Sequence, residues 1–247
     1  MALIQELEVQ GNWLFRRRGT LPYVMLPLLA SAMIFNHPSG LLFSETMEHL
    51  WLGFSAAVSA TGIIIRALVI GYVPSTTSGR NTKSQVASRV NQYGLYSIVR
   101  HPLYLGNFLV AFGLALLTAR YWFILVFCLL YALYYERIMM AEEAFLHEKF
   151  GEEYDAWACR TPAFIPAFLK WKNYDMKFSW KIVLRREYPG LLVVVSGFLL
   201  LNWTQEFLLD RQPIDITVKY FFITTLVVVL LLRFLKKKTN VLDTPGR

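Results

Sequence analysis

Two pairs of polar residues stand at the two ends of a long, mostly apolar part of the chain. Arg100 and His101 come directly before a first apolar run. Glu142 and Glu143 come a few residues after a second one. Carboxylates accept hydrogen bonds from hydroxyl and ammonium groups, and an imidazole changes its charge near neutral pH. These four side chains suit a cationic, hydroxyl-rich small molecule, although the pattern alone does not name it.

The two apolar runs, 102–118 and 121–137, are separated only by the letters "TAR". A connection this short makes them an antiparallel helical hairpin. Pro102 fits the first turn of the first helix, because its missing N–H would have no partner there in any case. Both polar pairs are therefore expected at the same face of the membrane.

The second helix of this hairpin continues past the apolar run. Residues at helical spacing extend the pattern to Phe150, Gly151 is expected to cap the helix, and "GEEYDAW" is expected to start another turn. Glu142 and Glu143 then emerge about one to two helical turns beyond the lipid. The sequence therefore predicts that the two acids lie beside the Arg-His pair.

The overall composition is typical of a polytopic membrane protein. Of the 247 residues, 55% are hydrophobic and 17% are charged, and the mean hydropathy is +0.41. We expect an all-α integral membrane protein with about six transmembrane helices, over residues 20–36, 49–72, 102–118, 121–137, 189–207 and 214–235. The two cysteines indicate neither a disulfide framework nor a metal site.

The positive charge is distributed unequally between the two sides of these spans. With the N-terminus inside, 21 of the 25 Lys and Arg residues fall in cytoplasmic segments. We therefore expect both termini in the cytoplasm. The net charge of +8 is then an orientation signal, and a nucleic-acid partner is not expected.

We interpret residues 1–247 as a single membrane domain with three parts. Residues 1–92 hold the first helices and a cytoplasmic loop, and 93–168 hold the hairpin with its C-terminal extension. Residues 169–247 hold a basic, aromatic segment and the last two helices. Interfacial anchoring is favoured for that segment, with a substrate lid as the alternative.

Two linked motifs resemble one known superfamily. "GLYSIVRHPLYLGN" is followed, after the hairpin, by "EEAFLHEKFGEEYDAWACRTPAFIP". This arrangement is similar to that of the isoprenylcysteine carboxyl methyltransferases and phospholipid methyltransferases, and it covers about Tyr93 to Pro166. Leu95 and Trp157 depart from the pattern, where many members have proline and tyrosine. Neither departure removes a polar group.

The resemblance implies a methyltransferase that uses S-adenosylmethionine, held in a cytoplasmic pocket formed by the hairpin and its extension. Glu142 and Glu143 would take the ribose hydroxyls or the amino group, and the Arg160–Pro162 segment would fold over the cofactor with Tyr154. By motif position, the implied cofactor-binding residues are Tyr96, His101, Leu103, Tyr104, Asn107, Glu142, Glu143 and Tyr154.

The acceptor decides which further residues matter. A phosphate or carboxylate oxygen is already anionic and needs no strong base, so catalysis rests on orientation by a planar guanidinium. Arg100, Arg160 and Arg66 are the candidates for this clamp. Arg66 lies inside a span, where it could equally be a buried partner of Glu136 or a snorkelling side chain. An amine acceptor would instead need Glu136 or a neighbouring carboxylate as base.

A membrane lipid is the expected partner. The 73–92 loop resembles a bacterial branch that includes lipid A 1-phosphate methyltransferases, so Arg80, Lys83 and Gln85 are candidates for binding a sugar-phosphate headgroup in the bacterial inner membrane. The same loop could simply attract anionic lipid. A prenylated cysteine and phosphatidylethanolamine are alternative acceptors. Two alternatives belong to other functional classes. A non-catalytic carrier would be expected to have polar groups at the membrane midplane, and the predicted polar residues gather at one face instead. A nicotinamide-dependent reductase would be expected to carry a Gly-rich dinucleotide-binding fingerprint, which the sequence lacks.

Overall fold

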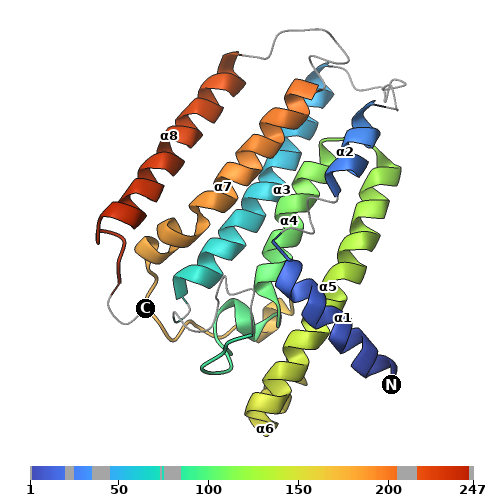
Figure 1. The fold of residues 1–247 in the computed structure, drawn as a ribbon, viewed down its shortest axis with the longest axis vertical. Helices are drawn as coiled ribbons and strands as arrows, with labels where there is room; N and C mark the ends of the chain where they lie inside the picture. Colours follow the sequence, from blue (N-terminus) through green and yellow to red (C-terminus); the bar gives the residue numbers. More distant parts are fainter. Residues whose placement is uncertain are drawn as a thin grey trace.

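A computed structural model describes residues 2–19, 25–34, 45–72, 74, 85–204 and 216–244. Within these residues the chain is helical apart from loops and one isolated bridge between Gly94 and Lys172. Figure 1 shows most of the long helices side by side, with α1 lying across α5. The elements are α1 (Leu3–Arg17), α2 (Met25–Ile34), α3 (Glu45–Tyr72), η2 (Leu95–Ser97), α4 (Pro102–Leu116), α5 (Tyr121–Phe150), α6 (Glu152–Ala158), η3 (Phe168–Lys170), α7 (Trp180–Trp203) and α8 (Ile216–Lys238).

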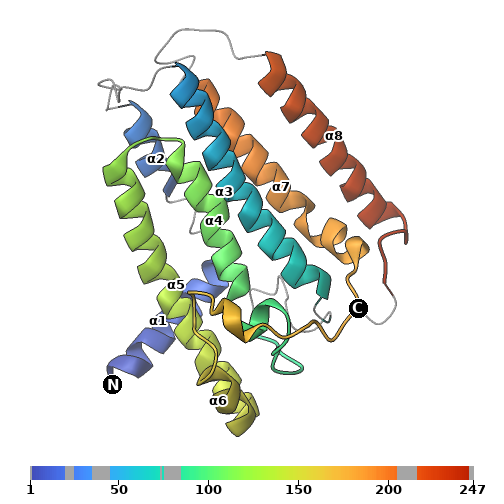
Figure 2. The same cartoon turned by 180° about the vertical axis from the view of Figure 1, so that it is seen from behind.

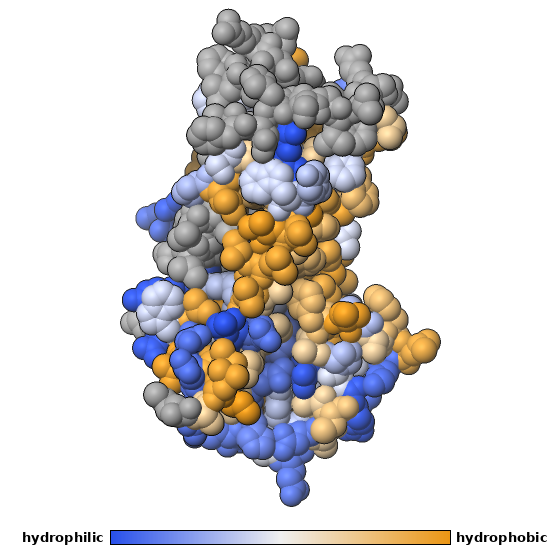
Figure 3. Space-filling model, turned by 90° about the vertical axis from the view of Figure 1, so that its right-hand side faces the viewer, coloured by the Kyte–Doolittle hydropathy of each residue, from blue (hydrophilic) through white to orange (hydrophobic). Residues whose placement is uncertain are grey.

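The helical class is confirmed, whereas the six-span arrangement stays a prediction. Among the described residues, His49–Tyr72 and Tyr121–Phe150 are long and apolar enough to cross a membrane, and Pro102–Leu116 is a shorter apolar helix. Figure 3 shows apolar residues gathered over the middle of one face and polar residues around one end. That distribution suits a protein whose middle is surrounded by lipid.

The predicted hairpin is present as α4 and α5. Pro102 occupies the first turn of α4, as expected, and residues 117–120 connect the two helices. Aromatic rings fill the space between them: Phe108 packs edge-on against Tyr131 with ring centroids 5.0 Å apart, and Phe112 lies 6.4 Å from Phe127. Aromatic pairs in these arrangements add to the area that they bury. The hairpin therefore holds its two ends in a fixed relation.

The predicted extension of α5 is also present. The helix runs for 30 residues to Phe150, a length of about 45 Å at the usual rise per residue. It is thus longer than a hydrocarbon core of about 30 Å. Gly151 ends it with a backbone φ of +52°, which only glycine adopts readily, and α6 follows. The α5 segment that carries Glu142 and Glu143 therefore extends beyond the apolar run.

Helices α3 and α4 approach each other closely at Gly62 and Gly106. A Cβ atom on Gly62 would lie 2.6 Å from the carbonyl oxygen of Gly106, and one on Gly106 would lie 2.7 Å from Cγ of Arg66. Small residues at such contacts let two membrane helices pack backbone to backbone. The Ser59 hydroxyl adds a hydrogen bond of 2.9 Å to the carbonyl of Val110. This contact brings Arg66 against the first turns of α4.

The N-terminal helix α1 packs across α5. Phe15 is buried in a cluster with Tyr104, Tyr135 and Ile138, and Arg137 donates a 3.0 Å hydrogen bond to the side chain of Gln10. From sequence, this segment carried only a topology signal. In the structure it forms a wall beside the end of the hairpin.

Two C-terminal helices complete the described fold. Helix α7 begins at Trp180, well before the predicted residue 189, and it contains Pro189 in its interior. Helix α8 packs on α7. The segment between α6 and α7 runs past the start of α4 (Figure 2), and Ser179 N–H donates a 3.0 Å hydrogen bond to the carbonyl of Gly71 at the end of α3. This segment therefore joins α3, α4 and α6 at one end of the molecule.

Candidate functional site

The backbone of Arg100 and His101 is fixed by the segment that follows α6. Arg100 N–H donates to the carbonyl of Pro162 at 2.8 Å, and His101 N–H donates to that of Ala163 at 3.2 Å. A third bond, of 2.9 Å, runs back from Ala167 N–H to the carbonyl of Ile98. These bonds satisfy backbone groups that the start of α4 would otherwise leave without partners. The side chains of Arg100 and His101 consequently project from a rigid backbone.

The two acids of α5 converge on these side chains, as the sequence predicted. The imidazole of His101 places Nε2 at 2.8 Å from Oε1 of Glu143 and Nδ1 at 3.7 Å from Oε2 of Glu142. Nε of Arg100 lies 3.2 Å from the same Glu143 oxygen. His101 is buried, and both carboxylates are partly buried. We call Arg100, His101, Tyr104, Glu142 and Glu143 the acid cluster.

Tyrosine and α1 complete one side of the acid cluster. The hydroxyl of Tyr104 donates a 2.6 Å hydrogen bond to Oε1 of Glu142, and NH1 of Arg18 lies 3.8 Å from that oxygen. The Tyr131 hydroxyl donates to the Tyr104 carbonyl at 2.7 Å, and the rings of Tyr104 and Tyr135 are 4.8 Å apart. A wall of aromatic faces thus stands next to two carboxylates.

The pKa values of two tyrosines outside the predicted spans are affected by the charges of Glu142 and Glu143. Burial, and then the charge of Glu143, raise the pKa of Tyr154 above its ordinary value. Burial, followed by the charge of Glu142, likewise raises the pKa of Tyr96. Both hydroxyls therefore keep their protons at neutral pH and remain hydrogen-bond donors. The Trp157 indole donates a 3.1 Å hydrogen bond to the Tyr96 carbonyl and ties α6 to this segment.

A second polar group lies deeper, between α3, α4 and α7. The Arg66 guanidinium makes two 2.7 Å hydrogen bonds to Glu187, from Nε to Oε2 and from NH2 to Oε1. Its NH1 donates to Oδ1 of Asn107. We call Arg66, Asn107 and Glu187 the Arg66 network. The carboxylate partner of Arg66 is therefore Glu187 and not Glu136.

Other predicted residues lie apart from both groups. Glu136 is largely exposed and lies 4.0 Å from Arg137, whereas Arg160 is exposed and donates to the Ala156 carbonyl within its own turn. Leu103 lies in the first turn of α4, partly buried. Gln85 donates a long 3.5 Å hydrogen bond to Asn12 of α1. Arg80 and Lys83 lie outside the described residues.

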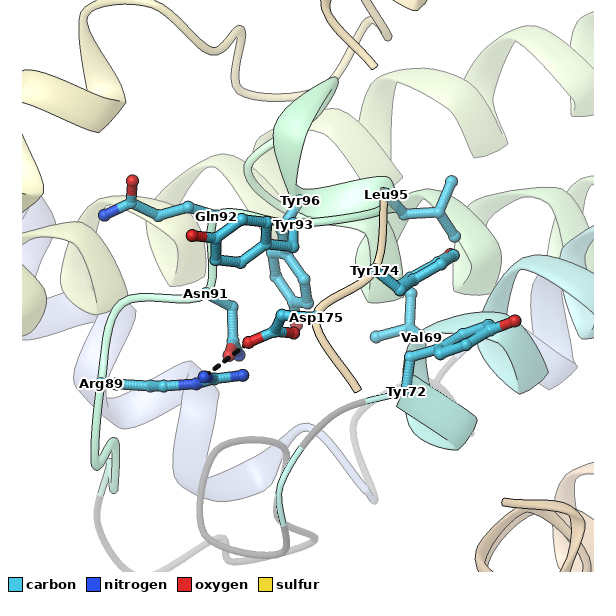
Figure 4. Close-up of a pocket in the computed structure, with 10 residues that line it drawn as sticks. All are labelled: Val69, Tyr72, Arg89, Asn91, Gln92, Tyr93, Leu95, Tyr96, Tyr174 and Asp175. Carbon is cyan, nitrogen blue, oxygen red and sulfur yellow. Dashed lines mark ion pairs between the residues drawn. The ribbon is translucent and has the colours of Figure 1, made fainter. Parts of the chain in front are cut away.

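A small hollow, lined in part by Tyr96, contains no residue of the acid cluster (Figure 4). The 2.7 Å ion pair between Arg89 and Asp175 forms part of its lining, and so do the stacked rings of Tyr72 and Tyr174. Burial raises the pKa of Tyr174 to about 12. Its lining residues are Val69, Tyr72, Arg89, Asn91, Gln92, Tyr93, Leu95, Tyr96, Tyr174 and Asp175. The hollow therefore joins the end of α3 to the 89–96 loop.

Comparison with known proteins assigns this arrangement to a family. Residues 49–153 match the model of the phospholipid methyltransferases. The cobalt-zinc-cadmium resistance protein CzcN of Cupriavidus metallidurans is 32% identical over 195 residues, which are 76% of this chain and 84% of that protein. The chain belongs to the phospholipid methyltransferase family. It is a membrane methyltransferase whose methyl donor is S-adenosylmethionine.

Further relatives of this family member differ in how much of the chain they match. The nickel-cobalt-cadmium resistance protein NccN of Alcaligenes xylosoxydans xylosoxydans is 29% identical over 158 residues, or 63% of this chain and 67% of that protein. The protein-S-isoprenylcysteine O-methyltransferase of Schizosaccharomyces pombe is 29% identical over 114 residues, or 44% of this chain and 48% of that enzyme. No solved structure matches the chain.

The acid cluster has the chemistry that the methyl donor of this family requires. A carboxylate offers about four acceptor positions, and the contacts to Glu142 and Glu143 use only some of them. The remaining positions suit ribose hydroxyls and an ammonium group. Aromatic faces such as those of Tyr104 and Tyr135 attract a sulfonium cation. The described residues contain no group of three or more His, Cys, Asp or Glu that could hold a metal ion.

Sequence reasoning missed three contributors to these sites. Arg18 and Phe15 belong to α1, whose basic residues indicated only membrane orientation. Glu187 belongs to α7, far from Arg66 in sequence. The one available signal was Arg66 itself, because an intramembrane charge needs a partner, but the sequence did not indicate that this partner is Glu187.

Proposed function

We propose that this methyltransferase transfers a methyl group to an anionic oxygen on a lipid or lipid-linked molecule. The observation that carries the proposal is the convergence of His101, Tyr104, Glu142 and Glu143 at the end of one helical hairpin. This cluster is rich in acceptors for a cationic donor and lies where the α5 helix leaves its apolar run. An acceptor can approach such a place sideways from the bilayer.

The residues of the chain have distinct tasks on the donor side. Glu142 and Glu143 accept hydrogen bonds from the donor's hydroxyl and ammonium groups, and His101 and Arg100 keep Glu143 in place. Tyr104 orients Glu142, and Tyr96, Leu103 and Tyr154 border the same space by motif position. Asn107, which motif position also assigns to the donor, contacts Arg66 instead. When bound, S-adenosylmethionine supplies a methyl group that leaves its sulfur and joins the acceptor oxygen. The surrounding aromatic wall excludes water.

An anionic oxygen is favoured over an amine because of where the carboxylates lie. An ammonium group must lose a proton before it can attack, so it needs a free base nearby. Glu136, the candidate base, is 63% exposed in its side chain and lies beside Arg137. The neighbouring carboxylates, Glu142 and Glu143, are assigned to the methyl donor in this proposal. An oxygen of a phosphate or carboxylate needs no proton removed, and orientation by a guanidinium is sufficient. N-methylation of phosphatidylethanolamine therefore has less support.

Two kinds of anionic acceptor follow from the resemblances. A lipid A phosphate agrees with the 73–92 loop, in which Arg80, Lys83 and Gln85 would contact the headgroup. The carboxylate of a prenylated cysteine agrees with the S. pombe relative, which is a protein-S-isoprenylcysteine O-methyltransferase. We retain the lipid A phosphate as the specific proposal, at the cytoplasmic leaflet of the bacterial inner membrane. Both termini would then be cytoplasmic, in agreement with the distribution of basic residues.

The decisive experiment has two arms. First, binding of S-adenosylmethionine to the purified protein in neutral detergent is measured by calorimetry, and an absence of binding by folded protein overturns the proposal. Second, methyl transfer from radiolabelled S-adenosylmethionine is measured with lipid A, a farnesylated cysteine analogue and phosphatidylethanolamine. Label in lipid A supports the specific acceptor, label in the cysteine replaces it, and label in phosphatidylethanolamine overturns the anionic-oxygen proposal.

A further inference from the structure

Arg66 is a positively charged residue within the candidate transmembrane span His49–Tyr72. Its guanidinium donates hydrogen bonds to Glu187 of α7 and to Asn107 of α4. Glu187 is 8% exposed, so the pair is largely removed from solvent. Burying two charges costs free energy that their attraction does not always recover, which makes such a pair weak evidence for stability alone. A binding role therefore has to be considered.

The guanidinium of Arg66 is not fully used by these partners. Arginine has five N–H donors in a planar fork, and three of them donate to Glu187 and Asn107. No other acceptor among the described residues contacts the remaining two. The Arg66 side chain is 22% exposed, twice the 10% of Glu187. The Arg66 side chain is thus less completely buried than its carboxylate partner.

A chain of contacts links Arg66 to the acid cluster. Asn107, which accepts from NH1 of Arg66, donates from Nδ2 to the Tyr135 hydroxyl at 3.5 Å. The Tyr135 ring lies 4.8 Å from that of Tyr104, which bonds to Glu142. The Arg66 guanidinium and the Glu142 carboxylate are therefore linked through Asn107, Tyr135 and Tyr104. The link brings a group that can bind an anionic acceptor near the carboxylates that suit a cationic donor.

We propose that Arg66 and Asn107 bind the anionic group of the acceptor, and that Glu187 is the positioning residue that fixes the guanidinium from behind. This inference rests on the proposed function and identifies the residues that bind the methyl acceptor. The ligand is a phosphate or carboxylate attached to an apolar tail, and the tail lies in the bilayer beside α3 and α7. Arginine suits this task because its fork matches both oxyanions.

Helix α7 gains a role from this assignment. It lies outside residues 49–153, which match the family model, yet it supplies the residue that orients Arg66. The close contact of Gly62 with Gly106 sets the distance between α3 and α4, and so the reach of Arg66 to Asn107. The acceptor site therefore combines a helix pair within the matched region and a helix beyond it.

A purely structural ion pair predicts a different response to substitution. Arg66→Lys keeps a positive charge opposite Glu187 but removes the planar fork, so it weakens the two-bond pair with Glu187 as well as any binding of an oxyanion. Replacing both partners, as Arg66→Met with Glu187→Met, removes the charges together and keeps the volume apolar, which usually preserves folding. An acceptor site loses its function in both variants.

The test measures binding of dodecyl phosphate to the protein in maltoside micelles by calorimetry, with dodecylphosphocholine as the zwitterionic control amphiphile. We expect Arg66→Lys and the double Met variant each to bind dodecyl phosphate at least tenfold more weakly than the wild type. S-adenosylmethionine affinity, which depends on the acid cluster, is expected to change less than twofold and reports that both variants are folded. Arg185→Lys, in the 2.7 Å pair with Asp243, is the matched control and should bind like the wild type.

The outcomes separate this inference from the function on which it rests. Unchanged dodecyl phosphate binding in either folded variant overturns the acceptor site and leaves the donor site standing. Equal binding of the two amphiphiles by the wild type also overturns it, because a site for an anion must discriminate. If the folded wild-type protein does not bind S-adenosylmethionine, the proposed function itself is contradicted. If Arg66→Lys does not fold, the double Met variant decides the question.

Discussion

The acid cluster and the Arg66 network are both ionic, but they are built differently. The acid cluster joins two helices that are consecutive in the chain, and its carboxylates retain free acceptor positions. The Arg66 network joins three helices, and Glu187 takes two of the guanidinium's donors. The first arrangement leaves capacity for a ligand with many donors. The second holds one group in a fixed orientation.

The largest expected effect separates the two regions by stability. Glu187→Ala leaves the Arg66 charge buried without its carboxylate, which costs about 3–5 kcal/mol of stability. We expect a clearly lower midpoint of thermal unfolding in neutral detergent. Asp243→Ala breaks the more exposed pair with Arg185 and should change stability by no more than about 1 kcal/mol. Equal unfolding midpoints for the two variants would mean that the Arg66–Glu187 pair is no more important for stability than the exposed pair.

The next effect concerns the acid cluster. Glu143→Gln keeps the side-chain shape but removes the charge that faces His101 and Arg100. Hydrogen bonds to charged groups contribute about 1.5–3 kcal/mol, so S-adenosylmethionine affinity should fall by roughly 10- to 100-fold. Calorimetry on the purified protein measures it. Glu148→Gln, on an exposed position of the same helix, is the control. Equal affinities in both variants would place the donor elsewhere.

A smaller effect is expected where the two regions meet. Tyr104→Phe keeps the ring beside Tyr135 but loses the 2.6 Å hydrogen bond to Glu142. Loss of orientation of one carboxylate should weaken S-adenosylmethionine binding by about 1 kcal/mol, roughly fivefold. Dodecyl phosphate binding should not change, because Asn107 reaches Tyr135 and not Tyr104. A change in both affinities would mean that the two regions act as one.

The smallest effect is expected at Arg160. Its guanidinium is exposed and donates to the Ala156 carbonyl, so Arg160→Ala should change turnover and donor affinity by about 0.5 kcal/mol or less. Steady-state kinetics with lipid A as acceptor checks this. A loss of turnover above tenfold with unchanged donor affinity would restore Arg160 as the acceptor clamp.

The acid cluster could be predicted because its geometry is local. A helical hairpin with a very short connection must be antiparallel, so its two open ends lie at the same side. Gly151 marks where the second helix ends. The pairing of Arg66 with Glu187 could not be predicted in this way, because helical spacing gives no information on which distant helix lies beside α3. The contribution of Arg18 was missed for a related reason: the basic run to which it belongs has a sufficient explanation in membrane orientation.

The position of α1 against α5 also constrains the order in which the protein is assembled. Helix α1 leaves the ribosome before α5, and the surface on which Phe15 packs is synthesised roughly 100 residues later. At translation rates of about 5–20 residues per second, this delay lasts about 5–20 s. During that time its apolar face needs another partner, and the nearby bilayer surface can supply one. Helix α1, which borders Glu142, is thus translated before the hairpin against which it packs.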